Sequence, residues 1–521
     1  MGTFHILNFG CRASQADGAA LKQQLLRAGL DEAANIEDSA VAILNTCTVT
    51  ASADAEVRQF VRRLHRRNPQ CRILVTGCYA QRAPEEIAKL EGVAWVMGNS
   101  HKHLVSEILV SGDRLIGSSS HRAIESLESG DREIGRSGER KESDAPVVVS
   151  RPQSIAPLVQ INSNIDRDTC QLTSNAQGGE ALRSPDDPIS RSPDSAVVLV
   201  GEITEEFHFA PLFADDRTRP TLKIQDGCDA RCSFCIIPTV RGQSRSLPPQ
   251  TVLEQVQQLV DRGYHEVVLS GINLGGYGRD LDRSINFLQI VERILRETSI
   301  ARIRISSIEL MDVSPALIQL VATEPRMAQH FHIPLQSGSD RILRLMNRRY
   351  WTKHYAERIL AIREQIPNAA IGADVMVGFP GETDADHAAS LRFIQSIPFT
   401  YLHIFPYSAR PGTPAAISPA QVNGRVARER SQEIRAVIDS KREAFLAAQV
   451  GQTLPALTLD EIQDGERIAL TTNYLKVALP TGEIAANRLI DVSIGRAHAG
   501  QLYGYLPASV AQPHPALQLT R

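Results

Sequence analysis

The sequence lacks any apolar run long enough to cross a membrane, which takes about 20 consecutive apolar residues. Its first residues, MGTFHILNFGCR, carry neither a basic lead nor an extended apolar core. A myristoylation motif is also absent, because Ile6 stands where serine or threonine is required. We therefore expect a cytoplasmic protein that does not bind a membrane.

A large excess of one charge is missing as well. The chain has 56 Lys and Arg against 59 Asp and Glu, a net charge of −3. Such a chain has no general attraction to nucleic acid, so any RNA contact must come from local basic patches. The candidate RNA-contacting residues lie in two basic runs: Arg62, Arg63, Arg66 and Arg67, and Arg341, Arg344, Arg348, Arg349, Tyr350 and Trp351.

The chain contains a single C-x-x-C pair, within the segment Lys223 to Arg245. There Cys228, Cys232 and Cys235, here called the loop trio, fall within eight residues. Zinc normally requires a fourth protein ligand, usually from a second pair, which this sequence does not provide. A cubane iron–sulfur cluster held by three cysteines would keep one iron open for another ligand. The spacing favours such a cluster over a structural zinc site.

The pattern C-x-x-x-C-x-aromatic-C, with Phe234 as the aromatic residue, resembles the radical S-adenosylmethionine (SAM) superfamily. This resemblance implies that the loop trio holds a [4Fe–4S] cluster whose open iron binds SAM. It also implies that reductive cleavage of SAM produces a radical able to abstract hydrogen from an unactivated carbon.

Three further cysteines follow predicted strands near the N-terminus. The apolar runs 4–9, 40–45 and 72–76 alternate with helical patterns at 16–29 and 52–67, which predicts an open parallel sheet. The three are Cys11, Cys47 and Cys78, here called the dispersed trio. The carboxyl ends of parallel strands share one edge, so we expect these thiols to converge. Cys71 begins a strand and is therefore expected at the opposite edge of the sheet, so we interpret it as structural.

The segments around the dispersed trio, FGCRASQADG, NTCTVTASADAEVRQFVRR and VTGCYAQRAPEEI, are similar to the methylthiotransferases. This resemblance implies that the dispersed trio holds a second [4Fe–4S] cluster, which carries the sulfur to be transferred. The residues after Cys11 depart from the family, since Arg12-Ala13-Ser14-Gln15 replaces its more usual Lys or Gln, aliphatic, Asn, Gln. This departure affects contacts of the loop rather than the ligand itself.

Composition divides the rest of the chain. Residues 1–111 form the N-terminal domain, and 112–219, rich in Ser, Arg, Asp, Glu and Gly, are expected to be a disordered linker. Cys170 within the linker is read as incidental. Short apolar pieces at 147–149, 158–161 and 197–200 are candidates for isolated strands.

Residues 220–447 alternate helical patterns with strands, expected at 265–271, 302–307, 330–333, 371–377 and 401–405. The predicted fold class is α/β, with a central partial (β/α)6 barrel whose site lies at the carboxyl ends of its strands. The resemblance places SAM-binding residues in the cysteine loop and at those ends: Phe234, Asn273, Ser307, Gln336, Ser337 and Asp374. Polar residues there also cap helices, which is the alternative reading.

Residues 448–510 contain regularly spaced short strands that predict a small antiparallel barrel, followed by a tail at 511–521. Its position and the segment TTNYLKVALP resemble the RNA-binding TRAM barrel of methylthiotransferases. Its balanced charge gives no independent support for RNA binding.

The function implied is addition of a methylthio group to carbon 2 of N6-threonylcarbamoyladenosine beside the tRNA anticodon. The run IQDGCDARCSFCIIPTVRGQSRS resembles this branch of the family. The partners implied are a tRNA anticodon stem-loop and a reducing electron donor, with two [4Fe–4S] clusters and SAM as cofactors. Alternatives are an isopentenyladenosine tRNA or a ribosomal-protein aspartate as substrate, or a non-catalytic zinc-binding RNA adaptor. The sequence does not define the sulfur source or the oligomeric state.

Overall fold

A computed structural model describes residues 2–111, 196–203, 218–281, 285–480 and 484–507. The described residues form two compact units. Among these residues, the first unit comprises 2–7, 28–46, 56–111 and 196–202, and the second comprises 8–27, 47–55, 203, 218–281, 285–480 and 484–507. The predicted disorder of the linker, Cys170 and the strand candidates at 147–149 and 158–161 lie outside the described residues.

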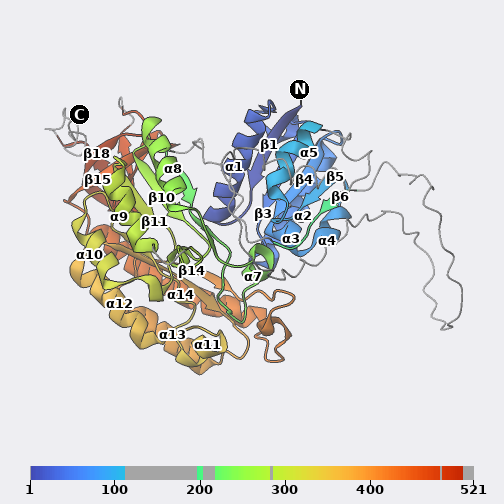
Figure 1. Cartoon of the computed structure of the whole chain (residues 1–521). Helices are drawn as coiled ribbons and strands as arrows, with labels where there is room; N and C mark the ends of the chain where they lie inside the picture. Colours follow the sequence, from blue (N-terminus) through green and yellow to red (C-terminus); the bar gives the residue numbers. More distant parts are fainter. Residues whose placement is uncertain (1, 112–195, 204–217, 282–284, 481–483, 508–521) are drawn as a thin grey trace, which may run out of the picture. The chain divides into compact units, whose positions relative to one another are not determined.

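The N-terminal part of the chain builds a parallel sheet in the order β2-β1-β3-β4-β5-β6 (Figure 1). Its strands are β1 Thr3–Asn8, β2 Asp31–Glu32, β3 Val41–Thr46, β4 Arg72–Gly77, β5 Val93–Met97 and β6 Val197–Leu199. Runs such as VAILNT and RILVTG are almost entirely buried, as expected for parallel strands covered on both faces. The predicted open parallel sheet is thus confirmed.

The sixth strand comes from inside the predicted linker. β6 pairs in parallel with β5, with Trp95 opposite Val197 and Met97 opposite Leu199. The sequence predicted an isolated strand at 197–200, because the short VVLV run gives no sign of its partner. The N-terminal sheet therefore takes its last strand from a segment that follows residue 111 by more than 80 positions.

Helices of this region are α1 Arg12–Arg27, α2 Ala51–Arg67, α3 Cys78–Arg82, α4 Pro84–Ala88 and α5 Val105–Ser111, with 3₁₀ turns η1 Ile36–Asp38 and η2 Lys102–Leu104. In α2, Val57, Val61 and Leu64 recur at helical spacing and are fully or almost fully buried. The arginines on its other face are exposed.

The second unit contains two three-stranded parallel sheets, β11-β10-β7 and β12-β13-β14, joined by an isolated bridge between Ser307 and His332. Their strands are β7 Thr221–Lys223, β10 Glu266–Ser270, β11 Arg302–Ile305, β12 His330–His332, β13 Ala370–Val377 and β14 Tyr401–Pro406. A short antiparallel pair, β8 Gln225–Asp226 and β9 Arg245–Ser246, precedes β10. This order is that of the predicted partial barrel.

Helices cover the outside of these strands (Figure 1). They are α8 Pro249–Asp261, α9 Phe287–Glu297, α10 Pro315–Thr323, α11 Asp340–Leu345, α12 Thr352–Gln365, α13 Asp384–Ser396 and α14 Gly424–Ala447, whereas the short helix α7 Ile237–Arg241 follows the cysteine loop. The 3₁₀ turns are η4 Leu274–Gly276, η5 Leu310–Asp312 and η6 Pro414–Ile417. Alternate strand residues such as Ile303, Ile305 and Phe331 join helix residues in one apolar core.

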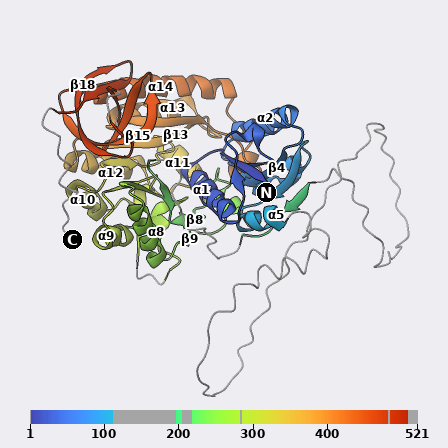
Figure 2. The ribbon, with the colours of Figure 1, turned by 90° about the horizontal axis from the view of Figure 1, so that it is seen from above.

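The C-terminal strands close into a barrel in the order β15-β16-β17-β19-β18, shown in red in Figure 2. They are β15 Thr453–Gln463, β16 Glu466–Thr471, β17 Lys476–Pro480, β18 Leu489–His498 and β19 Gln501–Tyr505. Inward residues including Ala456, Val477 and Val492 form its small core. The predicted C-terminal β-barrel is confirmed, although one of its strand pairs, β17 with β19, is parallel rather than antiparallel. Closure removes the open edges that would invite association.

Candidate active site

The loop trio lies between β8 and α7, in a loop fixed by backbone contacts. Gly227 has φ +70°, and a Cβ there would come within 1.8 Å of the Gln243 carbonyl oxygen. Only glycine fits this approach. The N–H of Cys228 donates to the Gly242 carbonyl at 3.1 Å, and the N–H of Cys235 donates to the Cys232 carbonyl at 3.2 Å. The three thiols are therefore held by the turn that presents them.

Two of these sulfurs accept hydrogen bonds. The N–H of Ala230 donates to Cys228 Sγ at 3.4 Å, and Arg348 Nη1 donates to Cys232 Sγ at 3.4 Å. Burial disfavours the charge of Arg348, but Tyr350, Glu309 and Cys232 outweigh burial and raise its pKa. A charged guanidinium beside a half-buried sulfur suits a thiolate that ligates a metal centre.

The remaining electrostatics also fit a cluster. Burial raises the pKa of Cys228 and raises that of Cys235 to about 12, and the neighbouring thiols add to both shifts. Three mutually repelling thiolates in a partly buried loop require a cationic partner, because metal binding is what deprotonates such ligands. The residues present thus fit an iron–sulfur cluster bound by three sulfurs.

Two of the predicted SAM-binding residues end in buried oxygens without partners. Asn273 Oδ1, after β10, and Gln336 Oε1, after β12, accept no hydrogen bond within the described residues. Gln336 also has φ +64°, a conformation that is uncommon outside glycine, and it bridges Val375 of β13. Unsatisfied buried acceptors at strand ends fit a polar ligand such as SAM.

The other predicted SAM-binding residues already have partners or are packed. Ser337 lies beside Ser390 at 3.3 Å and accepts from the Ser339 N–H at 3.2 Å. Asp374 Oδ1 lies 3.1 Å from His332 Nε2 and 3.2 Å from His403 Nδ1. Ser307 is half-buried, and Phe234 packs edge-on against Phe379 at 6.4 Å between ring centroids.

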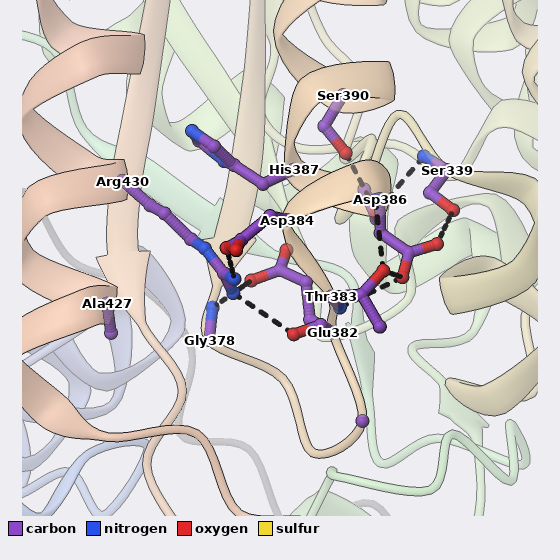
Figure 3. A network of polar contacts seen from close by, with 12 residues as sticks. Ser339, Gly378, Glu382, Thr383, Asp384, Asp386, His387, Ser390, Ala427 and Arg430 are labelled. Carbon is purple, nitrogen blue, oxygen red and sulfur yellow. Dashed lines mark hydrogen bonds and ion pairs between the residues drawn. The ribbon is translucent and has the colours of Figure 1, made fainter.

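The loop after β13, within the motif GFPGET, is closed by an ion network that the sequence reasoning missed (Figure 3). Glu382 Oε2 accepts from the Gly378 N–H at 2.6 Å and from Arg430 Nη1 at 2.7 Å. Arg430 also pairs with Asp384 at 2.7 Å. Gly378 has φ +71°, and a Cβ there would come within 2.7 Å of the Ala427 Cβ. These contacts fix the turn at the carboxyl end of β13.

Each member of the dispersed trio follows one of three adjacent parallel strands. Cys11 comes three residues after β1, Cys47 directly after β3, and Cys78 directly after β4. A Cβ at Gly10, whose φ is +106°, would come within 2.3 Å of the Cys47 Cβ. Asn99 Nδ2 donates to Cys78 Sγ at 3.5 Å. Cys71 precedes β4, is buried and lies 3.8 Å from the Ser39 hydroxyl, in keeping with a structural role.

The segment after Cys11 is bound to the partial barrel of the second unit by a buried ion network. Arg241 donates to Asp17 at 3.0 Å and to Asp226 at 2.9 Å, while Lys223 contacts the same two carboxylates. Burial favours the neutral form of Asp226, but Lys223 and Arg241 outweigh burial and lower its pKa to about 2. Helix α1 thus packs on β7, whereas the sequence predicted it only as a crossover helix of the N-terminal sheet.

The segment after Cys47 is bound in the same way. Arg410 Nη1 donates to Asp54 Oδ2 at 2.7 Å and to the Thr48 carbonyl at 3.3 Å, and the Thr48 hydroxyl donates to Asp54 Oδ1 at 2.7 Å. The side chains of Arg410 and Asp54 are 4% and 5% exposed. The loops that carry Cys11 and Cys47 are therefore both part of the second unit.

The predicted RNA-contacting residues separate by exposure. Arg348 is 6% exposed and bound to Cys232 and Glu309, and Tyr350 is 3% exposed with its hydroxyl donating to Pro334. Neither is available to RNA, and the prediction for these two was wrong, because the basic run folds back over the cysteine loop. The exposed members are Arg62, Arg63, Arg66, Arg67, Arg341, Arg344, Arg349 and Trp351.

Two family models match the chain. The radical SAM superfamily matches residues 222–394, and a family described as "Uncharacterized protein family UPF0004" matches residues 3–98. The first match covers the loop trio and the strands of the partial barrel. The second unit therefore contains a radical SAM domain, and the dispersed trio lies within the second match.

Curated relatives extend over nearly the whole chain. The chain is 32% identical to "Threonylcarbamoyladenosine tRNA methylthiotransferase MtaB" of Bacillus subtilis, covering 95% of this chain and 93% of the relative. It is 33% identical to the protein of the same name in Aquifex aeolicus, covering 90% and 94%. It is 29% identical to "tRNA-2-methylthio-N(6)-dimethylallyladenosine synthase" of Pelotomaculum thermopropionicum, covering 97% and 98%. The chain belongs to the radical SAM methylthiotransferase family, on the MtaB-like branch.

No helix among the described residues combines the length and apolar character needed to cross a bilayer.

Proposed function

We propose that the protein adds a methylthio group to carbon 2 of N6-threonylcarbamoyladenosine next to the anticodon of tRNA. The observation that carries the proposal is the loop trio with its two hydrogen-bond donors, in a chain whose similarity to the MtaB relatives runs through both units. As a member of this family the protein uses two [4Fe–4S] clusters and SAM. A reducing electron donor is part of the proposal.

Cys228, Cys232 and Cys235 would hold the cluster that binds SAM, and Cys11, Cys47 and Cys78 would hold the second cluster. When bound, these groups supply a radical that removes hydrogen from an unactivated carbon, and the sulfur that replaces it. The support for the first trio is its N–H···S contacts, and for the second the position of each cysteine at the end of a parallel strand.

The chain's own residues orient these groups. Arg348, held by Glu309, donates to Cys232 and places positive charge beside the sulfur. Asn273 and Gln336 present unsatisfied oxygens for the SAM we place at the strand ends. The networks of Asp17 and Asp54, within the second unit, hold the loops of Cys11 and Cys47 in place. An anticodon loop suits such a site, because its bases are partly unstacked and are presented at low cost.

The test is nucleoside mass spectrometry of tRNA from cells lacking the gene. We expect the 2-methylthio form of threonylcarbamoyladenosine to disappear, and to return with the wild-type gene or Cys71→Ala but not with Cys232→Ala. If the methylthio form of isopentenyladenosine disappears instead, the substrate is isopentenyladenosine tRNA, as the name of the dimethylallyladenosine relatives indicates. Zinc in protein purified without oxygen, with no cleavage of SAM under reduction, would support the adaptor alternative.

A further inference from the structure

The inner face of the partial barrel is polar and charged. In β11, Ile303 and Ile305 pack outward against the helices, so Arg302 and Arg304 point the other way. The same alternation holds in β12 and β14, where Phe331 and Leu402 belong to the apolar core. Their neighbours along each strand therefore point inward: His330 and His332 in β12, and Tyr401 and His403 in β14. Interiors of related barrels are usually filled by branched aliphatic side chains. This departure indicates that the inner face serves a polar ligand.

Positive charge exceeds negative charge at one end of this face. Arg219, Arg302 and Arg304 surround one carboxylate, Glu266, at 3.5, 3.5 and 2.8 Å. Burial lowers the pKa of Arg302 to about 10, as expected where cations outnumber their counter-ion. Glu266 is fully buried, so the imbalance is not screened by water there.

Arg12 adds a fourth guanidinium to this cluster. Its Nη2 donates to the Tyr474 hydroxyl at 3.0 Å, its only hydrogen bond to any described residue. Burial raises the pKa of Tyr474, but Arg12, Arg219 and Arg304 outweigh burial and lower it. The residues of the cluster all belong to the second unit.

The guanidinium groups of this cluster differ in how many of their N–H donors are used. Arg304 uses three of its five N–H groups, because it donates to Glu266 and to the carbonyls of Thr471 and Thr472. Arg12, by contrast, uses one of its five N–H groups. His330 is 5% exposed, stacks on Tyr474 at 4.3 Å, and its Nδ1 has no partner within the described part of the chain. His403, on the edge strand β14, is 63% exposed, so the face opens to solvent.

We propose that Arg12, Arg219 and Tyr474, beside His330, form an anion subsite that receives the carboxylate of the threonylcarbamoyl group on the substrate adenine. The inference rests on the proposed function, and it identifies the carboxylate as the chemical group by which an enzyme of the MtaB-like branch recognises its substrate. The threonyl moiety carries a free carboxylate, whereas an isopentenyl group carries no charge. An uncharged substituent would leave the guanidinium groups uncompensated, which disfavours the wrong substrate.

The experiment measures binding to reconstituted enzyme without reductant, so that no turnover occurs. Fluorescence anisotropy compares three anticodon stem-loops, which bear threonylcarbamoyladenosine, its carboxamide analogue, or unmodified adenosine. A charge-assisted hydrogen bond corresponds to about tenfold to hundredfold in affinity. We expect wild-type enzyme to prefer the carboxylate over the carboxamide by at least about tenfold, and Arg12→Gln to lose that preference while keeping its iron.

Tyr474→Phe removes only the hydroxyl that holds Arg12, and we expect it to weaken the preference in part. Arg296→Gln on α9 is the matched control, since its side chain is 66% exposed and pairs with Glu297 at the surface. Equal binding of carboxylate and carboxamide by an enzyme that still methylthiolates the natural stem-loop would overturn the subsite alone. If Arg12→Gln weakens the binding of all three RNAs equally, the cluster binds a phosphate of the RNA backbone rather than the threonyl carboxylate. Failure to methylthiolate the natural stem-loop would overturn the proposed function instead.

Discussion

Arg241 donates from Nη2 to Asp17 Oδ2 at 3.0 Å across 224 positions of sequence, and the two side chains are 2% and 5% exposed. Asp17 lies six residues after Cys11, and Arg241 lies six residues after Cys235. One buried contact therefore connects the segment that follows the first predicted cluster ligand with the helix that follows the last.

We expect Asp17→Asn to lower the free energy of unfolding by about 3–5 kcal/mol, because it leaves Arg241 and Lys223 with one fewer buried carboxylate. Denaturant unfolding monitored by circular dichroism measures the change. The control is Glu297→Gln, which breaks a surface pair with Arg293 at 2.9 Å and should change stability much less than Asp17→Asn. Equal effects of the two substitutions would contradict the importance of the buried network.

The Glu266 cluster predicts a dependence of stability on acid. Burial favours the neutral carboxyl, but Arg304, Arg219 and Arg302 outweigh burial and lower the pKa of Glu266 from its ordinary 4.5 to about 2. A depressed folded-state pKa gives stability that is present above 4.5 and is lost as the pH falls toward 2. The difference in unfolding free energy between wild type and Glu266→Gln should therefore shrink from pH 5 to pH 2. A constant difference would show that the carboxylate does not titrate with folding.

The two trios predict separable clusters. Anaerobic reconstitution of wild-type protein should give two [4Fe–4S] clusters, and Cys232→Ala or Cys11→Ala should each retain half of the iron. Cys71→Ala should retain all of it, because Cys71 lies at the opposite end of β4. Iron analysis together with electron paramagnetic resonance distinguishes these proteins. A single cluster in the wild type would remove the basis for a reaction that needs two.

Arg348 predicts a change in reduction potential. Its N–H donor and positive charge at Cys232 Sγ stabilise the more negative, reduced state of a bound cluster. Arg348→Gln should therefore make the potential more negative and slow reductive cleavage of SAM. A redox titration of the Cys11→Ala background isolates the cluster in question, and Arg344→Gln nearby, which is exposed, is the control. An unchanged potential would limit Arg348 to a structural role.

The arginines of α2 predict a salt dependence of RNA binding. Arg62 and Arg66 are exposed, whereas Arg67 is paired with Glu37. If Arg62 and Arg66 each contact a phosphate, their joint replacement by Gln should flatten the slope of log K against log salt by about 1.4–1.8. Arg296→Gln should leave the slope unchanged. A parallel loss of affinity with the original slope would point to misfolding of α2.

The sequence predicts the sheet, the partial barrel and the closed C-terminal barrel because each depends on short-range periodicity. It does not predict Arg348 beside Cys232 or Asp17 beside Lys223, because these contacts span 116 and 206 positions. The sequence also does not predict that Arg348 and Tyr350 are buried, because a basic run is interpreted as solvent-exposed unless its buried partners are known. One signal was available: Arg302 and Arg304 alternate with Ile303 and Ile305 in a strand covered by helices, which leaves only the inner face for the charges.

Tyr474 has a consequence for experiments that shorten the protein. It lies in a turn of the C-terminal barrel at φ +67°, yet its ring stacks on His330 of the radical SAM strands, and the neighbouring carbonyls of Thr471 and Thr472 bind Arg304. Truncation before residue 448 would remove residues that cover the inner face of the catalytic domain. The three arginines that contact these residues, Arg12, Arg302 and Arg304, would then be exposed to water. Inactivity of such a fragment would therefore report damage to the active domain as much as the loss of the proposed RNA-binding barrel.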